Sequence, residues 1–376
     1  MQEKYFGEQI PKLGFGLMRL PQLADETIDI AQVKQMVDAF MAAGFTYFDT
    51  AYVYGNGASE LAIKEALVDR YPRESYQLTT KLPVWANTTP EDVRNIFETS
   101  MRRTQAGYFD FYLLHNVNRN NVADFERLHV WEYVQELKKQ GLVKHAGFSF
   151  HDTADMLDEL LTKHPEVDFV QLQINYIDWN SDAVQSRKCY EVARKHGKSI
   201  IVMEPVKGGA LAGLSDEIQS LYRAVRPDLS IPSWAIRFVA SLDGIITVLS
   251  GMSTLAQMQD NLSYMKDFQP LCAEEYAAID KAVAILNNTP TVPCTACKYC
   301  VDDCPQNINI PEIFKALNGY RVYHNRAKEI SPYQQAVGEG GAAKDCLECG
   351  LCETHCPQHL EIRELLKEAS SVFDEA

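Results

Sequence analysis

Eight of the ten cysteines in the chain stand in two runs of identical spacing. Both runs read C-x2-C-x2-C-x3-C-P, and their cysteines are Cys294, Cys297, Cys300 and Cys304 in the first run and Cys346, Cys349, Cys352 and Cys356 in the second. Thiolates at this spacing ligate a 4Fe–4S cube. Because the pattern occurs twice, we expect redox chemistry, or a fold braced by metal, in the last part of the chain.

The proline after the fourth cysteine of each run predicts that the two runs exchange a ligand. Three closely spaced cysteines can take three corners of one cube, while the fourth usually serves the neighbouring cube. We therefore expect two clusters, one held by Cys294, Cys297, Cys300 and Cys356 and the other by Cys346, Cys349, Cys352 and Cys304. Two structural zinc sites are the alternative, but such sites typically use two C-x2-C pairs with a longer interval between them. The other two cysteines, Cys189 and Cys272, fit no motif and are expected to be small buried residues.

Four polar residues in the first 285 residues have types that could transfer a proton together. Asp49, Lys81 and His115 each stand at the end of an apolar, strand-like segment, and Tyr54 stands in the loop after the first of them. A phenol with a pKa of about 10 is a poor acid at neutral pH. A nearby ammonium lowers that pKa, a carboxylate fixes the ammonium in place, and an imidazole can orient a carbonyl oxygen. The four residues predict general acid chemistry if the fold brings them together.

Strand-like and helix-like segments alternate through the same region. The strand-like segments lie at residues 13–20, 46–50, 77–82, 109–116, 144–150, 169–174, 199–206 and 245–251. The segments between them place apolar residues at helical spacing, among them 33–41, 61–68, 124–140, 153–164, 182–196 and 254–265. Eight such units in about 250 residues predict a (β/α)8 TIM barrel, in which catalytic residues stand at the C-terminal ends of the strands. A doubly wound sheet is less favoured, because the early Gly14-Phe-Gly16 segment lacks the third glycine of a dinucleotide fingerprint.

The cysteine runs predict a second, smaller domain after the barrel. Residues 311–319 and 361–369 are expected to form helices beside the clusters. The chain is therefore interpreted as a TIM barrel over residues 1–285, followed by a mainly helical, two-cluster ferredoxin-like domain over residues 286–376.

The barrel region resembles the aldo-keto reductase family over roughly residues 5–285. The resemblance is carried by Leu13-Gly-Phe-Gly-Leu-Met-Arg, Phe48-Asp-Thr-Ala-Tyr-Val-Tyr-Gly, Thr79-Thr-Lys-Leu, Tyr112-Leu-Leu-His and Gly251-Met-Ser-Thr-Leu-Ala-Gln-Met-Gln-Asp-Asn. The order and spacing of all five motifs make the resemblance specific. With the two cysteine runs, the whole chain resembles the ferredoxin-fused aldo-keto reductases of anaerobic microbes.

The resemblance implies reversible, NAD(P)H-dependent reduction of an aldehyde or ketone to an alcohol. Asp49, Tyr54, Lys81 and His115 match the family's catalytic tetrad, with Tyr54 as the general acid. The positions that match cofactor contacts are Gly16, Met18, Arg19, Asp49, Ser149, Gln171, Met203, Pro205, Gly251, Ser253, Gln257, Asp260 and Asn261. Substrate specificity is expected in the loops at residues 84–88 and 117–121 and after Lys207, with Trp85 as one candidate wall.

The chain departs from the family's pattern at three cofactor positions. Met203 stands where many relatives have an aromatic ring, and Phe150 follows Ser149 where an asparagine is common. Gln257 replaces the arginine that in many relatives pairs with the 2′-phosphate of NADP. The resemblance to the family still favours NADP(H) over NAD(H). The argument from charge is weaker than usual, because Gln257 offers no positive charge to the 2′-phosphate.

A second interpretation is an iron–sulfur electron-transfer protein whose barrel binds a nicotinamide or a flavin as a docking or regulatory module. Nicotinamide passes two electrons as hydride, whereas each cube passes one, and a flavin is the usual converter between them. No clear flavin motif is present, although barrels bind FMN without one, so a flavin is left open. The complete tetrad favours the enzyme, and an external redox carrier, a ferredoxin or flavodoxin, is the expected partner of redox-active clusters.

Composition excludes other classes of function. The 376 residues include 36 Lys and Arg against 51 Asp and Glu, a net charge of −15. Nucleic-acid binding needs a basic footprint, and anionic membrane surfaces repel such a chain. The first residues lack the layout of a signal peptide, and no apolar stretch approaches the ~20 residues of a membrane helix. We therefore expect a cytoplasmic protein with a small carbonyl or alcohol substrate and no nucleic-acid or membrane partner.

Overall fold

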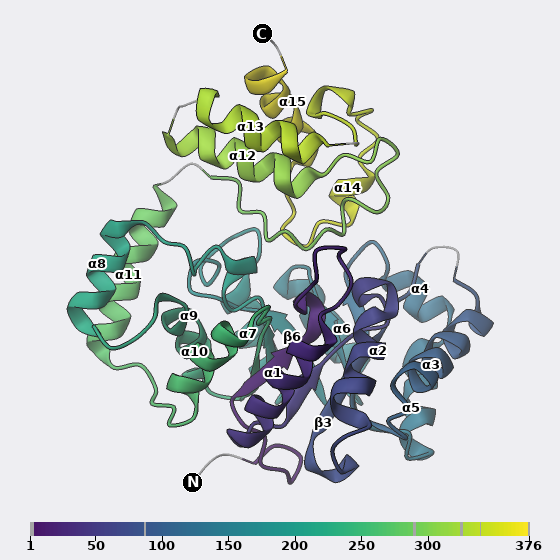
Figure 1. Cartoon of the computed structure of the whole chain (residues 1–376). Coiled ribbons are helices and arrows are strands. Elements are labelled where there is room, and N and C mark those ends of the chain that lie inside the picture. The colour runs from purple at the N-terminus through teal and green to yellow at the C-terminus, as the bar shows by residue number, and fades with distance from the viewer. Residues whose placement is uncertain (1–3, 86–87, 289–290, 324–325, 339, 375–376) are drawn as a thin grey trace.

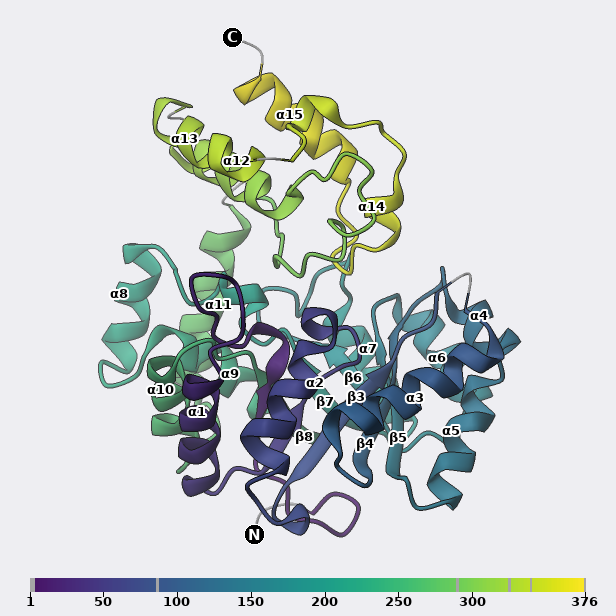
Figure 2. The ribbon, with the colours of Figure 1, turned by 45° about the vertical axis from the view of Figure 1, so that its right-hand side comes forward.

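The computed structural model describes residues 4–85, 88–288, 291–323, 326–338 and 340–374. Within them, eight parallel strands form a closed barrel in sequential order, which confirms the predicted TIM barrel (Figures 1 and 2). The barrel closes because β1 pairs with both β2 and β8. The strands are β1 Leu13–Gly16, β2 Tyr47–Asp49, β3 Gln77–Leu82, β4 Phe109–Val117, β5 Val143–Phe150, β6 Phe169–Gln173, β7 Ser199–Met203 and β8 Ile245–Ser250.

The strand register brings the predicted polar residues to one end of the barrel. Asp49 pairs with Gly16, so the ends of β1 and β2 are level, and it pairs with Thr79, two residues before Lys81 in β3. Lys81 in turn pairs with Leu113, two residues before His115 in β4. Since all strands run parallel, their C-terminal ends meet at one mouth. We call this end of the barrel the mouth.

Two predicted strands are shorter than expected, because the chain turns away from the sheet early. β1 ends at Gly16, and Leu17–Arg19 form a 3-10 turn. β7 ends at Met203, and the next residue, Glu204, has a φ of 57° that no strand tolerates. The predictions of strands to residues 20 and 206 were therefore wrong at their ends. Because the strands end early, Arg19 and Glu204 lie at the mouth.

Helices cover the outside of the barrel. They are α1 Ile30–Ala42, α2 Ala58–Ile63, α3 Pro90–Thr104, α4 Val122–Arg127, α5 Val130–Lys139, α6 Ala154–Lys163, α7 Ser186–Lys195, α8 Asp216–Val225, α9 Ile231–Ala240, α10 Leu255–Met265 and α11 Ala273–Asn287. The helix predicted at residues 124–140 is two helices, because His129 between them has a φ of 54°. α3 begins with a capping box in which Thr89 and Asp92 satisfy each other's backbone.

The end of the barrel opposite the mouth is closed by the N-terminal segment. Tyr5 and Ile10 are buried with the inward-facing residues Tyr47, Phe111 and Phe169. Tyr47 and Phe111 meet edge to face, with ring centroids 5.1 Å apart. This filled interior leaves the mouth as the end at which a ligand can enter.

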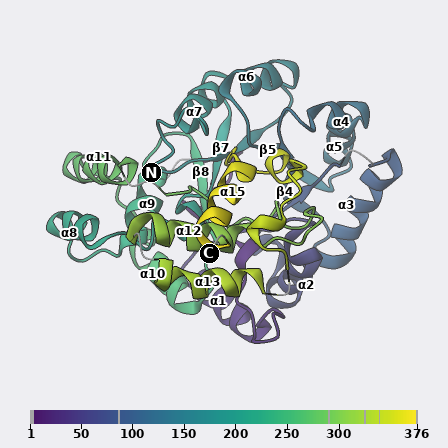
Figure 3. The ribbon, with the colours of Figure 1, turned by 90° about the horizontal axis from the view of Figure 1, so that it is seen from above.

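A second, mainly helical unit covers the mouth, and it confirms the predicted fold class. Its helices are α12 Ile310–Tyr323, α13 Arg326–Val337, α14 Leu351–Thr354 and α15 Ile362–Phe373. Seen from above, α12, α13 and α15 lie over the strands of the barrel (Figure 3). The unit has its own core, with Phe314, Leu317 and Leu366 at its centre. Helix α13 was not predicted, since Pro332 interrupts its pattern.

Cys189 and Cys272 lie outside this unit. Cys189 is buried as expected, whereas Cys272 is exposed at the start of α11, so the burial predicted for it was wrong. The predicted boundary after residue 285 falls in the last turn of α11. Among the described residues, none of the helices combines the length and the apolar character needed to cross a bilayer.

Candidate active site and cysteine pockets

The four predicted proton-transfer residues meet at the mouth. The Lys81 ammonium donates to Asp49 Oδ1 at 2.5 Å, to the carbonyl oxygen of Thr50 at 2.7 Å and to the Tyr54 hydroxyl at 3.3 Å. The Tyr54 ring meets the His115 ring edge-on, with centroids 5.9 Å apart. Lys81 is fully buried and Asp49 nearly so. The ammonium therefore links a carboxylate to a phenol in a site shielded from water.

Burial sets the protonation states in this site. It raises the pKa of Tyr54 well above its usual range, and the Asp49 charge raises it further. Burial also lowers the pKa of His115 well below its usual range, and the Lys81 charge lowers it further. The lowering of the Tyr54 pKa that was expected from Lys81 does not dominate, because the phenol is buried and Asp49 compensates the ammonium. At neutral pH, Tyr54 keeps its proton and His115 is uncharged.

The residues predicted to hold the nicotinamide lie side by side on β5, β6 and β7. Ser149 is the register partner of Gln171, and the Ser149 hydroxyl accepts a hydrogen bond from the Asn116 amide at 2.7 Å. The Gln171 amide nitrogen donates to Met203 Sδ at 3.4 Å. The side-chain carbonyl oxygen of Gln171, Oε1, is buried and has no hydrogen-bond partner among the described residues. An orphaned buried acceptor is costly, so this oxygen fits a ligand that carries an amide N–H, as nicotinamide does.

The predicted contacts from β1 and β8 also gather at the mouth. A Cβ atom on Gly16 would lie 3.4 Å from the Ser250 carbonyl oxygen, and one on Gly251 would lie 3.9 Å from Arg19. Met18 lies in the 3-10 turn that leads to Arg19, and Pro205 is buried after β7. Arg19 Nη2 is 3.8 Å from Glu204 Oε1, and burial raises the pKa of Glu204.

The predicted adenosine contacts lie around the start of α10, and they divide into two groups. Gln257 Oε1 accepts a hydrogen bond from the Ser253 amide at 2.7 Å in an exposed turn. Asp260 instead accepts from Ser230, and Asn261 bonds to Gln257 O, Ser250 and Tyr264. Ser253 and Gln257 therefore bond to each other at the surface. Asp260 and Asn261 already have partners within the fold.

The cysteines line two pockets in the crossed sets that the sequence predicted. One pocket is lined by Cys294, Cys297, Cys300 and Cys356, and the other by Cys304, Cys346, Cys349 and Cys352. We call them the first and the second cysteine pocket. In each set, the pre-proline cysteine of one run thus joins the three closely spaced cysteines of the other.

The two loops that carry the cysteines repeat one backbone conformation. Ala296 and Glu348, each two residues after the first cysteine of a run, have φ of 52° and 53°. Each of their amides donates to the first cysteine of its run, Ala296 N to Cys294 Sγ and Glu348 N to Cys346 Sγ, both at 3.4 Å. Each loop therefore wraps its cysteines around a pocket and directs N–H groups at sulfur.

The cysteine pockets fit a cluster better than a single ion. Among the described residues, no group of three or more His, Cys, Asp or Glu side chains is close enough to hold one metal ion. A zinc site needs four ligands about 2.3 Å from one point, whereas a cube holds its thiolates at separate corners. Burial raises the pKa of Cys297 to about 12 and of Cys352 to about 11. The thiolates therefore need the positive charge of bound metal.

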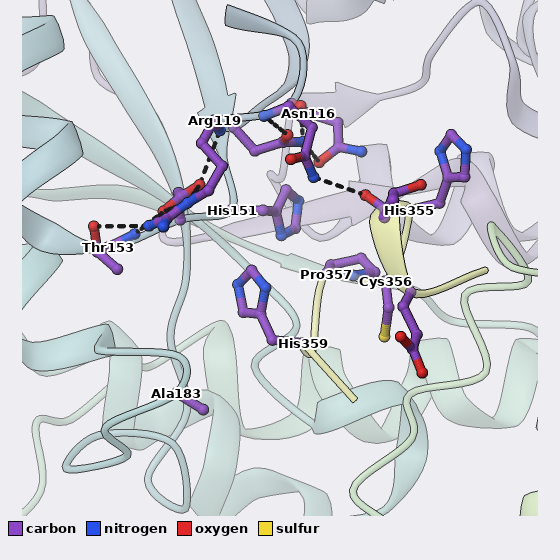
Figure 4. A pocket seen from close by; sticks show the side chains of 14 residues that line it. Asn116, Arg119, His151, Thr153, Ala183, His355, Cys356, Pro357 and His359 are labelled. Atoms are coloured by element: carbon purple, nitrogen blue, oxygen red, sulfur yellow. Dashed lines mark hydrogen bonds and ion pairs between the residues drawn. The ribbon is translucent and has the colours of Figure 1, made fainter. Parts of the chain in front are cut away.

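A pocket of about 310 Å³ lies where the two units meet (Figure 4). Its walls come from the loops after β4 and β5 and from residues 353–359, and they include Asn116, Asn118, Asn120, His151, His355 and His359. Figure 4 shows the rings of His151 and His359 directed into the pocket. Burial lowers the pKa of His151 to about 3 and also lowers that of His359.

The charged groups that line this pocket are each paired. Glu353 pairs with Arg363, which lies outside the pocket lining. The Arg119 guanidinium pairs with the buried Asp152 carboxylate. The pocket is thus polar but presents mainly uncharged hydrogen-bonding groups. Three of its lining residues, Asn118, Arg119 and Asn120, belong to the loop at residues 117–121 in which substrate specificity is expected. Of the other predicted specificity loop, residues 86 and 87 lie outside the described residues, and Trp85 is exposed.

Two family models match the chain. The aldo/keto reductase family model matches residues 12–284, and the model of a 4Fe-4S dicluster domain matches residues 293–361. The first covers the barrel, and the second covers both cysteine runs.

Solved structures share the barrel fold. The holo form of an aldo-keto reductase from Bacillus halodurans is 24% identical, with a TM-score of 0.60, over 73% of this chain and 93% of that chain. An aldo-keto reductase from Klebsiella pneumoniae in complex with NADPH is 20% identical, with a TM-score of 0.59, over 72% of this chain and 90% of that chain. At these identities the likeness shows the fold alone.

Curated relatives match shorter parts of the chain. Probable aldo-keto reductase 1 of Glycine max is 29% identical over 55% of this chain and 59% of its own length. D-galacturonate reductase of Fragaria ananassa is 28% identical over 53% of this chain and 63% of its own length. The chain thus spans about six tenths of the length of these relatives.

Proposed function

The chain belongs to the aldo/keto reductase family, and from this premise we propose that it reversibly reduces the carbonyl group of an aldehyde or ketone to an alcohol. NADP(H), rather than NAD(H), is the proposed cofactor. The observation that carries the proposal is the hydrogen-bonded set of Asp49, Lys81 and Tyr54, with His115 beside it. This set is buried at the one open end of a barrel, where a reacting carbonyl can be held away from water.

Each residue of the set has a distinct part in the reaction. Tyr54 keeps its proton at neutral pH and donates it to the carbonyl oxygen as that oxygen gains negative charge. The Lys81 ammonium bonds to the phenol oxygen and stabilises the charge that the proton leaves behind. Asp49 holds Lys81 in place from the other side. The uncharged imidazole of His115 orients the carbonyl oxygen by one hydrogen bond.

The nicotinamide supplies the hydride when it is bound. Ser149 and Gln171 are proposed to hold its carboxamide, because they lie level on neighbouring strands and the Gln171 carbonyl oxygen has no other partner among the described residues. The proposed contacts for the adenosine end are Ser253 and Gln257. Asp260 and Asn261 are proposed to shape that site rather than to anchor the ligand, since their side chains are engaged.

We propose that the substrate is a small, polar carbonyl compound. The pocket where the two units meet, at about 310 Å³, lies at the lower end of the range for small-molecule sites, and its lining reaches Asn116 but includes none of the tetrad residues. Asn116, one of its walls, follows His115 directly in the chain. Amide and imidazole groups that carry no charge suit hydroxyl and carbonyl oxygens better than a hydrocarbon or a strongly charged group.

The second unit is proposed to carry two 4Fe–4S clusters, one in each cysteine pocket, ligated in the crossed sets. Two clusters allow one-electron exchange with an external carrier such as a ferredoxin or flavodoxin. The alternative function, electron transfer with the barrel as a docking module, gains support from the position of the first cysteine pocket next to the mouth. In that case, reduction of the clusters rather than of a carbonyl is the main reaction.

An anaerobic screen tests the proposed function. Purified protein is given small hydroxylated aldehydes and ketones with NADPH or NADH, and alcohol formation is measured by chromatography. We expect alcohol to form at a rate that follows NADPH oxidation one to one. Rapid cluster reduction by NADPH, with no alcohol from any carbonyl, would contradict the proposal and favour the alternative. Parallel reactions with added FMN show whether a flavin takes part.

A further inference from the structure

The loop between two cysteines of the first pocket reaches into the candidate active site. Tyr299 stands between Cys297 and Cys300, and its hydroxyl lies 3.5 Å from Nε2 of His115. The two rings meet edge-on, with centroids 6.4 Å apart. A residue of the second unit therefore contacts a tetrad residue from which it is 184 positions distant in sequence.

The loop is held at the mouth by contacts that do not involve Tyr299. Arg19 Nη2 donates to the Thr295 carbonyl oxygen at 2.9 Å. Gly208 approaches the same oxygen so closely that a Cβ atom there would lie 2.2 Å from it. Only glycine permits this approach. The loop is therefore packed in direct contact with the barrel.

A second loop of the same unit is anchored independently. Gln358 and Gln173 exchange two hydrogen bonds through their side-chain amides, at 3.0 and 2.9 Å, and both residues are buried. The neighbouring Lys207 ammonium bonds to both oxygens of Asp178 and lies 3.4 Å from Gln358 Oε1. A buried network that is satisfied in this way specifies one arrangement. The position of Tyr299 is thus fixed from two sides.

Tyr299 approaches the imidazole that the proposed reaction uses. In the proposed reaction, the imidazole of His115 directs a hydrogen bond to the carbonyl oxygen beside Tyr54. The Tyr299 hydroxyl lies at the limit of hydrogen-bond distance from Nε2, and its ring stands edge-on to the imidazole. Its phenol therefore borders the space that the carbonyl carbon and its substituents must enter.

We propose that Tyr299 is a specificity-determining residue of the reductase site, and that its ring excludes carbonyl compounds with bulky substituents. This inference rests on the proposed function and adds to it a wall that the second unit supplies. The barrel alone then lacks part of its substrate site, and the cysteine loop completes it. Ring size, rather than the hydroxyl, is the property that selects.

The test compares a small and a bulky carbonyl in variants of one loop. Tyr299→Ala should raise the ratio of kcat/KM for an aryl ketone to kcat/KM for a three-carbon hydroxyketone by at least about tenfold, the usual effect of opening or closing a pocket wall. Tyr299→Phe, which keeps the ring, should leave that ratio within about twofold of the wild-type value. Asp302→Asn, at an exposed position in the same cysteine run, serves as the matched control and should also leave the ratio unchanged.

Two further measurements separate a wall from a purely structural role. NADPH affinity by fluorescence titration, and iron and sulfide content, should be the same in all variants. If Tyr299→Ala retains its iron and the ratio does not change, the inference is wrong. The proposed function would still stand in that case if the wild type reduces the carbonyl and Tyr54→Phe has lost this activity. If Tyr299→Ala fails to fold or loses iron, Tyr299→Trp is measured instead. Its larger ring must lower the same ratio of kcat/KM values. A ratio that does not fall overturns the inference.

Discussion

The tetrad depends on a single ammonium that serves two partners. Lys81 bonds to Asp49 and to Tyr54 in a site where the ammonium and the carboxylate are buried and Tyr54 is half-buried. In water such a triad would be screened, but away from water each charge interaction is stronger. The residue types and their order could be predicted from the sequence. The protonation states could not, because they follow from burial that only the folded mouth provides.

The pH dependence of reduction tests these protonation states. Tyr54 must be protonated to act, and since burial raises its pKa, the acid form persists until the pH exceeds about 10. His115 has a pKa well below its usual range, so it does not gain charge near pH 6.5. We expect kcat for reduction to be flat from about pH 6 to pH 9 and to fall only above that. If kcat falls to half of its maximum near pH 6.5, or at any other pH below 8, while the iron content stays full at each pH, this assignment is wrong.

Cofactor preference is a second property of single residues. Gln257 offers no charge to a 2′-phosphate, and its side-chain oxygen is taken by the Ser253 amide. We expect the wild type to prefer NADPH only modestly over NADH. Gln257→Arg should raise the ratio of the two Kd values by about tenfold in favour of NADPH, as one added charge-assisted hydrogen bond does. Gln140→Arg adds the same charge at an exposed position in the last turn of the α5 region and should leave the ratio unchanged. If the ratio of the two Kd values is the same in both variants, the 2′-phosphate of NADPH does not bind beside residue 257.

At the scale of elements, the two cysteine loops are copies of one structure that exchange a ligand. Lys298 and Gly350, each four residues after the first cysteine of a run, have φ of 67° and 79°. Asn307 and His359, each three residues after a pre-proline cysteine, repeat φ of 52° and 51°. The spacing of the cysteines predicted the crossed sets because three adjacent ligands and a rigid fourth leave few other arrangements.

Pairs of substitutions test the crossed ligation. Cys356→Ser should lower the iron content from about eight to about four atoms per chain, because one four-iron cube is lost. Adding Cys294→Ser should cost no more iron, since both residues serve the same cube. Adding Cys349→Ser instead should remove the remaining iron. Iron and labile sulfide are measured in anaerobically purified protein. If Cys356→Ser with Cys349→Ser still holds about four iron atoms, each run binds its own cluster.

Strand and helix order could be predicted almost throughout, but several ends could not. β1 and β7 stop early, and Arg19, three residues after β1, and Glu204, the residue after β7, lie at the mouth instead of extending the sheet. Arg19 donates to the Thr295 carbonyl oxygen of the second unit, a contact that leaves no local signal in the sequence. Tyr299 was also missed, because a contact across 184 residues leaves no local spacing signal.

At the scale of the whole molecule, the two units are joined by buried polar groups rather than by a linker alone. Gln358 and Gln173 satisfy each other beside the Lys207–Asp178 ion pair. Such an interface is specific, because separating it exposes the groups to water while misaligning it leaves them unpaired. The second unit thereby holds the first cysteine pocket next to the tetrad.

Removal of one amide should loosen this interface without unfolding either core. Gln358→Ala leaves the side-chain oxygen of Gln173 buried without its donor, while the side-chain nitrogen keeps Asp178 as a partner. Such a loss costs about 1–3 kcal/mol. We expect faster hydrogen exchange in residues 353–359 and in the loop that carries Tyr299, with unchanged protection of the barrel strands. Gln334→Ala, an exposed glutamine of the same unit, is the control. Exchange that rises equally in β4 and β6 would mean that the substitution destabilises the barrel instead.

The central claim, that the barrel transfers hydride to a carbonyl with Tyr54 as the acid, is tested most directly by following deuterium. NADPH deuterated at both C4 positions is mixed anaerobically with the protein and a small hydroxyketone, and the alcohol is examined by mass spectrometry. We predict one deuterium on the former carbonyl carbon with the wild type, and alcohol formation about 10²–10⁴-fold slower with Tyr54→Phe, which should still bind NADPH. Alcohol without deuterium, or a Tyr54→Phe variant as fast as the wild type, would contradict the account.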